Sequence, residues 1–288
     1  MVDFCLKNFS FSYPDSSRKA LDNINLSINS GEFVVISGKS GSGKSTLLSM
    51  LKPEISPYGK KEGVIYFFGK NADDFSQRES CEKIGFLLQN TEYQTVTHSV
   101  RTELAFGLEN MGLASETIRL RIAEISAYFS LEKIINKKIS ELSGGQKQLV
   151  CLASILAMHP KAVIFDEPAS QLDPTAAESF ISTIKALCKD IGITVIITEH
   201  RLEGIIPEAD RLIVLENGKI IADCNPSKLD TALFQSNSYI KNSMPFPMRL
   251  FAQLGHTENL PLNISDGRFS VCPSCAKRRI GNGIEFFM

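Results

Sequence analysis

A glycine-rich loop between an apolar strand and a helical run constrains this chain of 288 residues more than any other feature. The sequence reads FVVIS at 33–37, GKSGSGKS at 38–45 and TLLSMLK at 46–52. Glycine, four residues and then Gly-Lys-Ser is the pattern of a phosphate-binding loop, whose backbone N–H groups turn inward around phosphate oxygens. The alternative is a flexible Gly/Ser turn, and the strand before it and the helix after it argue against that reading.

The side chains of this loop predict binding of ATP with Mg²⁺. Lys44 can reach the β- and γ-phosphates, and Ser45 offers a hydroxyl to the metal. The helix that begins near Gly43 points its positive end at the same charge. The loop residues expected at the nucleotide are Gly38, Ser40, Gly41, Gly43, Lys44, Ser45 and Thr46.

Short apolar runs recur along the chain and alternate with helical patterns, which predicts an α/β fold with a largely parallel sheet. Several runs are apolar at nearly every position, as expected of strands covered on both faces. The expected strands are Phe33–Ser37, Val64–Phe68, Ile84–Leu88, Ala162–Asp166, Ile193–Thr198 and Arg211–Leu215. Helices are expected over Ser115–Phe129 and from Asp173-Pro174 to about Lys189.

The pattern divides the chain into two parts. We expect an ATPase domain over residues 1–225, in which about 90–155 lack clear strands and form a helical insert. Prolines at 226, 245, 247 and 261 punctuate a weakly patterned C-terminal extension over 226–288, for which the sequence suggests no role.

Charge and hydropathy limit the partners. A net charge of −1 argues against broad binding of a nucleic-acid backbone, so no nucleic acid is expected. No apolar run approaches the roughly 18 residues of a membrane span, and the run at 149–158 fits a buried helix. The N-terminus lacks the pattern of a secretory signal, and the seven cysteines favour a reduced, cytosolic compartment. Work at a membrane would therefore require another chain to span it.

The stretch AVIFDEP at 162–168 places two carboxylates at the end of an apolar strand. Adjacent strand residues face opposite sides, so Asp166 and Glu167 serve one site only where the strand ends, and Pro168 marks that end. Asp166 is expected to hold Mg²⁺ through water, and Glu167 to orient or deprotonate an attacking water. The alternative is an acidic surface turn.

A third element, LSGGQ at 142–146, precedes an apolar helix. Its two glycines expose backbone N–H groups at the helix N-terminus, which suits an anion. On its own the stretch is equally a simple helix start. The order of phosphate loop, Gln89, LSGGQ and then Asp166-Glu167 decides between the two readings.

In this combination the sequence resembles the ATP-binding-cassette (ABC) ATPases over about residues 2–225. The resemblance implies a P-loop NTPase fold, RecA-like, with a mostly parallel sheet, an N-terminal antiparallel β part and a helical subdomain. It identifies Gly38–Ser45 as Walker A, Gln89 as the Q-loop residue, Ser143, Gly144, Gly145 and Gln146 in the signature, Asp166 and Glu167 as Walker B with the catalytic glutamate, Asp173 in the D-loop and His200 as the switch histidine.

The resemblance also implies roles. Glu167, His200 and Gln89 are the catalytic residues, and Ser45, Gln89 and Asp166 surround Mg²⁺. Tyr13 matches the aromatic that stacks on adenine. The alternative is an ordinary core aromatic, with Phe11 as the rival stacker.

An alternative exists for His200, and Leu149 departs from the family pattern. The alternative for His200 is a solvated histidine. Leu149 stands where many relatives carry arginine, a departure that concerns the packing behind the signature.

In this family two cassettes close head to tail around two ATP molecules. The resemblance implies that the signature of one cassette caps the γ-phosphate held by Lys44 of the other, which supplies the second anion-stabilising wall. Both a homodimer and a heterodimer fit the sequence.

The segment QNTEYQTVTHSVRTELAFGLEN at 89–110 is similar to the energy-coupling factor importers, which serve vitamin and metal-ion uptake. Those ATPases follow the Q-loop glutamine with Asn, an acid and a second Gln, here Asn90, Glu92 and Gln94, and then carry a run like ELAFGLEN. ITEH at 197–200 also recurs there, whereas Thr91 replaces a common proline.

The resemblance implies a motor subunit of an importer on the cytoplasmic face of the membrane. Integral membrane subunits would be contacted through about Gln89–Asn110, with Phe106 and Leu108 as the apolar contacts unless they pack internally. The alternative function is a soluble cassette that acts on ribosomes or nucleic acid. The transported substrate is not written in the sequence.

Cys272-Pro-Ser-Cys275 supplies half of a four-ligand zinc site, with His256 the nearest further candidate. The alternative is a pair of plain exposed cysteines.

Overall fold

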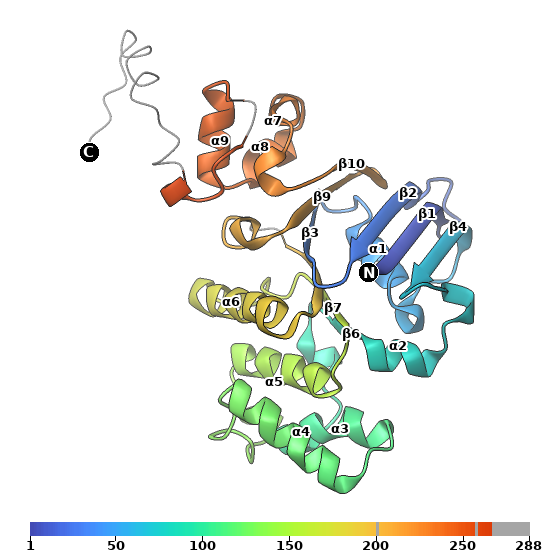
Figure 1. Cartoon of the computed structure of the whole chain (residues 1–288), viewed down its shortest axis with the longest axis vertical. Coiled ribbons are helices and arrows are strands. Elements are labelled where there is room, and N and C mark those ends of the chain that lie inside the picture. Colours follow the sequence, from blue (N-terminus) through green and yellow to red (C-terminus); the bar gives the residue numbers. More distant parts are fainter. Residues whose placement is uncertain (200–201, 257–258, 267–288) are drawn as a thin grey trace.

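A six-stranded sheet with the order β10-β9-β3-β8-β7-β6 carries the phosphate-binding loop. The computed structural model describes residues 1–199, 202–256 and 259–266. The strands of this sheet are β3 (Phe33–Ser37), β6 (Ile84–Leu87), β7 (Ala162–Asp166), β8 (Thr194–Thr198), β9 (Arg211–Glu216) and β10 (Lys219–Cys224). All neighbours pair in parallel except β10, which runs antiparallel to β9 (Figure 1).

Both faces of this sheet are covered, which explains why its strands are continuously apolar. Every residue of β3 and of β8 is buried. Along β3, Val35 joins one hydrophobic cluster, while Val34 and Ile36 join the cluster on the other face. The predicted α/β fold with a mostly parallel sheet is confirmed.

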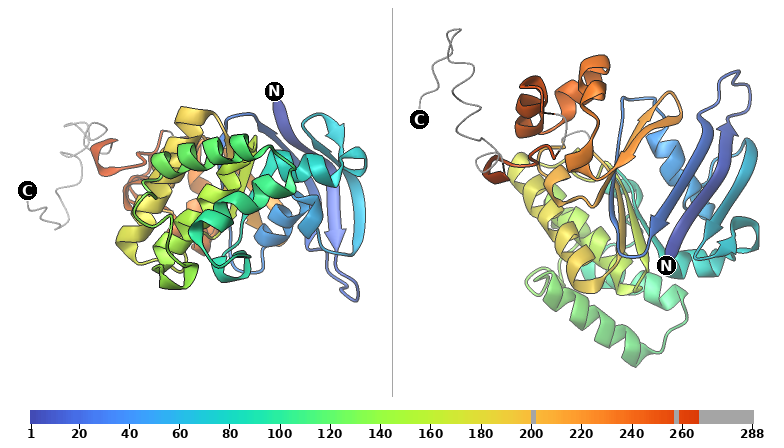
Figure 2. Two further views of the ribbon diagram at one scale, coloured as in Figure 1. Left: turned by 90° about the horizontal axis from the view of Figure 1, so that it is seen from below. Right: turned by 45° about the horizontal axis from the view of Figure 1, so that its top comes forward.

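A second, antiparallel sheet with the order β2-β1-β4-β5 lies beside the first (Figure 2). Its strands are β1 (Val2–Ser12), β2 (Leu21–Asn29), β4 (Lys60–Phe67) and β5 (Lys70–Asn71). Phe4 and Phe67 pack in one cluster with Leu47 of helix α1 (Lys44–Met50), so α1 is enclosed between the sheets. The apolar run at 64–68 therefore belongs to this sheet rather than to the parallel one.

Helices cover the opposite face of the six-stranded sheet. The covering helices are α5 (Gly144–Ala157) and α6 (Pro174–Ile191). Helices α3 (Val100–Asn110) and α4 (Ser115–Tyr128) pack on α5, and the short α2 (Gln77–Lys83) leads into β6. As expected from the sequence, the described residues between 90 and 155 contain no strand, and only the single bridge between Ser99 and Lys138 is formed there. None of the described helices is long and apolar enough to cross a bilayer.

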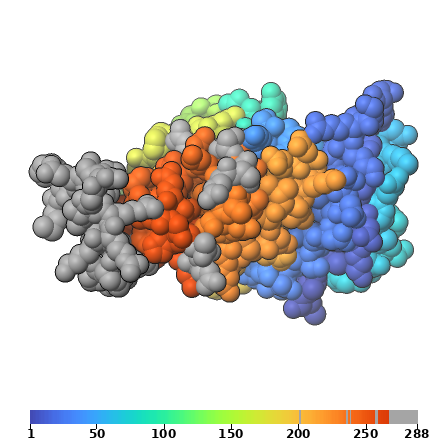
Figure 3. Space-filling view, turned by 90° about the horizontal axis from the view of Figure 1, so that it is seen from above, coloured from blue at the N-terminus to red at the C-terminus, as the bar shows by residue number. Residues whose placement is uncertain are grey.

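The beginning of the C-terminal extension is ordered, which its pattern does not predict. Helices α7 (Thr231–Ser236), α8 (Ser238–Ser243) and α9 (Phe246–Gln253) cover one end of the molecule, coloured orange to red in Figure 3. Ile240, Met248 and Phe251 are buried in the same cluster as the sheet. The prolines at 245 and 247 lie at the start of α9, where a helix tolerates them.

The extension also touches the strand that leads into the phosphate loop. The hydroxyl of Tyr239 lies 3.1 Å from that of Ser37, the last residue of β3. The Asn237 carboxamide donates to Glu216 at the end of β9, at 3.1 Å.

Candidate functional site

The loop at 38–45 joins β3 to α1 and requires glycine at two positions. Gly38 has φ 153° and Gly43 has φ 106°. A Cβ on Gly38 would lie 2.3 Å from the carbonyl oxygen of Leu215, and one on Gly43 would lie 2.6 Å from that of Ala20. The backbone thus approaches its neighbours more closely than any other residue allows.

The polar groups of this loop suit a phosphate. Lys44 is buried, and its ammonium donates to the carbonyl oxygens of Gly38 at 2.7 Å and Lys39 at 3.2 Å, so the cation lies against the loop. In the described part of the chain no hydrogen bond engages the backbone N–H of Ser40 or Gly41. The buried hydroxyl of Ser42 likewise has no partner among the described residues. These donors fit an anion, as expected of a phosphate-binding loop.

Oxygen ligands for a hard cation meet beside the loop. The Ser45 hydroxyl donates to the Asp166 carboxylate at 3.3 Å, and Thr198 donates to the same oxygen at 2.8 Å. Hydroxyl and carboxylate oxygens are the donors that Mg²⁺ prefers. The donor set at Ser45 and Asp166 therefore fits the metal expected from the sequence.

Glu167 follows Asp166 in a strained conformation. Its φ is 48°, in the left-handed region that a residue with a side chain occupies only at a cost. Its backbone N–H donates to the carbonyl oxygen of Thr198 at 3.1 Å and to the Thr198 hydroxyl at 3.0 Å. The turn lets Asp166 and Glu167 serve one site, as the end of a strand requires.

Gln89, just beyond β6, reaches the same turn. Its carboxamide donates to the Glu167 carboxylate at 3.2 Å and to the Ser170 hydroxyl at 3.4 Å. The structure therefore brings Gln89, Asp166 and Glu167 together with the phosphate loop.

The two candidate adenine-stacking aromatics differ in exposure. Tyr13 is 42% exposed, whereas Phe11 is fully buried. The Tyr13 hydroxyl lies 3.0 Å from that of Thr46, which places the ring beside the start of α1. Only Tyr13 presents a face to an incoming base.

The signature residues form the N-terminus of α5. Ser143 caps the helix by accepting from the Gln146 N–H at 3.3 Å, and the Gln146 side chain accepts from the Ser143 N–H at 3.1 Å. Gly144 is exposed and has no atom within 4 Å of an added Cβ. Because α5 and α1 pack on opposite faces of the six-stranded sheet, this element is not part of its own chain's phosphate loop.

Asp173 caps α6 and accepts from the Ala176 N–H at 3.0 Å. The methyl group of Ala176 lies 3.7 Å from the ideal Cβ position of Gly145, so the caps of α5 and α6 are neighbours. The other predicted residue of this group, His200, lies outside the described residues, as do Cys272 and Cys275.

Two side chains, Gln94 and Glu103, fix the segment after Gln89 through contacts that the sequence does not predict. The Gln94 carboxamide accepts from the Leu88 N–H at 3.0 Å and donates to the Phe86 carbonyl at 2.8 Å, so it pairs with the edge of β6 like a short strand. The buried Glu103 carboxylate accepts from the N–H groups of Val96 at 3.3 Å and Thr97 at 2.8 Å. The only signal in the sequence is polar residues close to an apolar helix.

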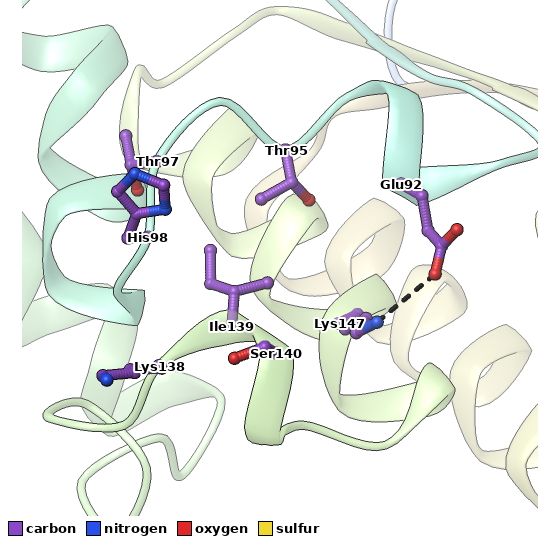
Figure 4. A pocket seen from close by; sticks show the side chains of 8 residues that line it. All are labelled: Glu92, Thr95, Thr97, His98, Lys138, Ile139, Ser140 and Lys147. Carbon is purple, nitrogen blue, oxygen red and sulfur yellow. Dashed lines mark hydrogen bonds and ion pairs between the residues drawn. The ribbon is translucent and has the colours of Figure 1, made fainter.

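This segment borders a cavity of about 610 Å³, drawn in Figure 4. It lies between the segment, the stretch at 138–140 and helix α5. Its lining residues are Glu92, Thr95, Thr97, His98, Lys138, Ile139, Ser140 and Lys147. On one wall Glu92 and Lys147 form an ion pair at 3.4 Å.

The two apolar residues proposed for a partner differ in position on α3. Phe106 is 39% exposed, whereas Leu108 is fully buried in the core. For Leu108 the alternative of internal packing therefore holds, because its side of α3 packs against α4 and α5.

Burial also sets the chemistry of two thiols on helices α5 and α6. It raises the pKa of Cys151 on α5, beside Thr95, to about 11, and that of Cys188 on α6 to about 11. Both thiols stay protonated and unreactive at neutral pH.

Comparison with known proteins identifies relatives. The family model described as ABC transporter matches residues 21–170. A Bacillus cereus protein assigned to the ABC transporter ATP-binding proteins is 39% identical over 266 residues, which cover 92% of this chain and 48% of that protein. The chain thus spans about half the length of the first curated relatives it matches. The energy-coupling factor transporter ATP-binding protein EcfA1 of Clostridium novyi is 38% identical over 77% of this chain and 80% of its own.

Solved structures of ABC transporter cassettes are also similar to this chain. Clostridium perfringens cbiO1, described as part of the ABC transporter complex cbiONQ, superposes with a TM-score of 0.72 at 28% identity, over 88% of this chain and 98% of that one. The ATP-binding cassette MJ0796, solved as a dimer with ADP and Pi, superposes with a TM-score of 0.66 at 29% identity, over 76% of this chain and 97% of that one.

Proposed function

Because this chain belongs to the ABC transporter family of ATP-binding proteins, we propose that it binds and hydrolyses ATP as the motor subunit of an importer of energy-coupling factor type. One observation carries the catalytic part of this proposal: four polar side chains meet beside the phosphate loop. Ser45 donates to Asp166 at 3.3 Å, and Gln89 donates to the neighbouring Glu167 at 3.2 Å. The similarity to EcfA1 and cbiO1 supports the importer type and an uptake cargo of the vitamin or metal-ion class.

The residues divide the work. Lys44 and the loop amides hold the phosphates, and Tyr13 stacks on the adenine. Such stacking contributes about 1–3 kcal/mol per base. Ser45, Asp166 and Gln89 would hold Mg²⁺, which would neutralise phosphate charge. Glu167 accepts the proton of the attacking water, and Gln89 orients the Glu167 carboxylate through their hydrogen bond.

The active unit contains two cassettes. Ser143, Gly144, Gly145 and Gln146 lie on the far side of the sheet from their own loop, so they serve the nucleotide of a second cassette. The dimeric cassette with a TM-score of 0.66 supports this arrangement. Asp173, at the neighbouring cap of α6, lies at the same interface.

The membrane partner docks on the segment 89–110, on the cytoplasmic face of the membrane. This segment carries exposed apolar side chains at Tyr93, Val96 and Phe106, beside the cavity of about 610 Å³. Gln94 ties the same segment to β6 next to Gln89. A partner seated there is in direct mechanical contact with the ATP site.

Co-purification from detergent extracts of native membranes tests this function. We expect the wild-type chain to retain an integral membrane protein, and Phe106→Asp to lose it while its affinity for ATP is unchanged. Leu120→Asp is the matched control, because Leu120 is an exposed leucine on the adjacent helix α4, outside the segment. Wild-type recovery of the membrane protein by Phe106→Asp would refute this docking surface, and sedimentation with ribosomes through moderate salt would contradict the transport role.

A further inference from the structure

The structure assigns Glu199 and Gln148 as positioning residues that hold the turn 167–170, and with it the Glu167 carboxylate, from two different elements. This inference rests on the proposed role of Glu167 as general base. The sequence pattern predicts no role for Glu199, and Gln148 lies outside every predicted site.

The turn needs holding because its first residue is strained. A left-handed φ at a residue with a side chain persists only where the surroundings over-determine it. Here the Glu167 carbonyl accepts from the Ser170 N–H at 3.2 Å and from the Ser170 hydroxyl at 2.8 Å. Its N–H is held by Thr198, as described above. These local bonds fix one end of the turn.

Glu199 fixes the middle of the turn from β8. Because Asp166 pairs with Thr198 in the parallel register of β7 and β8, the residue after Thr198 comes alongside the turn. The Glu199 side chain is 5% exposed, and its carboxylate accepts from the Ala169 N–H at 2.8 Å. A buried carboxylate that accepts a backbone N–H is a strong, directional anchor.

Gln148 fixes the same turn from α5. Its side chain is 3% exposed, and its carboxamide donates to the carbonyl oxygen of Pro168. The two anchors thus bind the same peptide group, between Pro168 and Ala169: Gln148 donates to its carbonyl oxygen and Glu199 accepts from its N–H. Among the described residues, neither side chain forms a hydrogen bond with the phosphate loop, and both bind the turn.

Because Gln148 lies on α5, the turn can couple the signature at the start of α5 to the Glu167 carboxylate. Gln148 belongs to α5, the helix that Ser143 caps. In the proposed sandwich the cap of α5 meets the nucleotide of the other cassette. A shift of α5 on that contact reaches Pro168 directly and moves Glu167, so closure of one site aligns the base of the other.

The first test compares Glu199→Leu with Glu199→Gln in the full chain. A misplacement of about 1 Å costs about 10²-fold in rate, so Glu199→Leu should lower kcat by about that factor. Glu199→Gln should keep kcat within about threefold, because a carboxamide oxygen still accepts the Ala169 N–H. The KM for ATP should change in neither variant. Equal kcat in Glu199→Leu and the wild type would overturn the assignment.

Combination with Glu167→Gln separates a positioning role from a general structural one. If Glu199 acts through Glu167, adding Glu199→Leu to Glu167→Gln should lower the residual turnover no further. An additional loss of the same size would show that Glu199 acts elsewhere, and the inference would be wrong.

Gln148→Leu repeats the test from the other side and serves if Glu199→Leu does not fold. It should lower kcat in the same way and show the same lack of additivity with Glu167→Gln. Ser154→Ala is the control on the same helix, because the Ser154 hydroxyl donates to the carbonyl oxygen of Cys151 at 2.8 Å, its single hydrogen bond among the described residues. Its kcat should equal that of the wild type.

The experiments distinguish a failure of the proposed base, Glu167, from a failure of its two anchors. Unchanged kcat in Glu167→Gln would remove the proposed base itself. A slow Glu167→Gln with unchanged kcat in both Glu199→Leu and Gln148→Leu would remove only the anchors.

Discussion

Lys44 is the side chain on which affinity for ATP depends most directly. Its buried ammonium binds two carbonyl oxygens of its own loop, so the cation is already held where phosphates are expected. A hydrogen bond to a charged group contributes about 1.5–3 kcal/mol, which corresponds to a loss of roughly 10–150-fold in affinity.

We therefore expect Lys44→Ala to weaken ATP binding by that factor, measured by titration calorimetry with MgATP. Lys39→Ala is the matched control, because Lys39 lies in the same loop with an exposed side chain. Unaltered affinity in Lys44→Ala would count against the phosphate-loop assignment.

At the scale of single elements, two apolar residues of α3 that are two positions apart lie in different environments. Leu108 is buried among α3, α4 and α5, whereas Phe106 is partly exposed. Truncation of a fully buried leucine typically costs about 2–5 kcal/mol. Leu108→Ala should therefore lower the free energy of unfolding in urea by that amount, and Phe106→Ala by much less. The reverse order would show that α3 is rotated about its axis.

The buried thiols give an element-scale prediction that depends on pH. The thiolate is the reactive species, and with a pKa of about 11 it makes up only about 10⁻³ of Cys151 or Cys188 at pH 8. Alkylation of the folded protein, followed by peptide mass spectrometry, should modify the exposed Cys81 before either buried thiol. Reaction at the buried pair should rise with pH toward 11, and equal rates for all three thiols at pH 8 would contradict the packing of α5 and α6.

The elements that the sequence predicts well are those with one dominant signal. The phosphate loop is recognised by its glycine and lysine spacing. Strands β3, β7 and β8 are continuously apolar, because both faces of their sheet are covered. The side-chain roles of Gln94, Glu103 and Glu199 depend on backbone groups of other elements, which periodicity does not reveal. The sequence leaves open whether Leu108 or Phe106 packs internally, because the face of α3 that points inward depends on how α4 and α5 pack.

At the scale of the whole molecule, the C-terminal helices belong to the main core. Their apolar residues are separated by prolines and short polar stretches, so the sequence shows no long period, yet they fill the same cluster as the sheet. Through the hydrogen bond between the hydroxyls of Tyr239 and Ser37, this segment contacts the residue that precedes the phosphate loop.

Ile240→Ala should therefore destabilise the whole chain, by about 2–5 kcal/mol, because Ile240 is fully buried. Urea unfolding should remain a single transition at a lower midpoint. Leu254→Ala, at an exposed leucine just beyond α9, serves as control and should have little effect. An unchanged midpoint in Ile240→Ala would mean that the extension folds apart from the core.

ATP turnover by Glu167→Gln tests the central claim, because the phosphate loop, the proposed metal ligands and the strained turn meet at that carboxylate. Phosphate release at saturating MgATP should be measured for the wild type and the variant, with any subunits that copurify. Loss of a general base typically lowers the rate by about 10²–10⁴, or about 3–5 kcal/mol, so we predict a fall in that range with ATP still bound. A wild-type rate in Glu167→Gln would contradict the account.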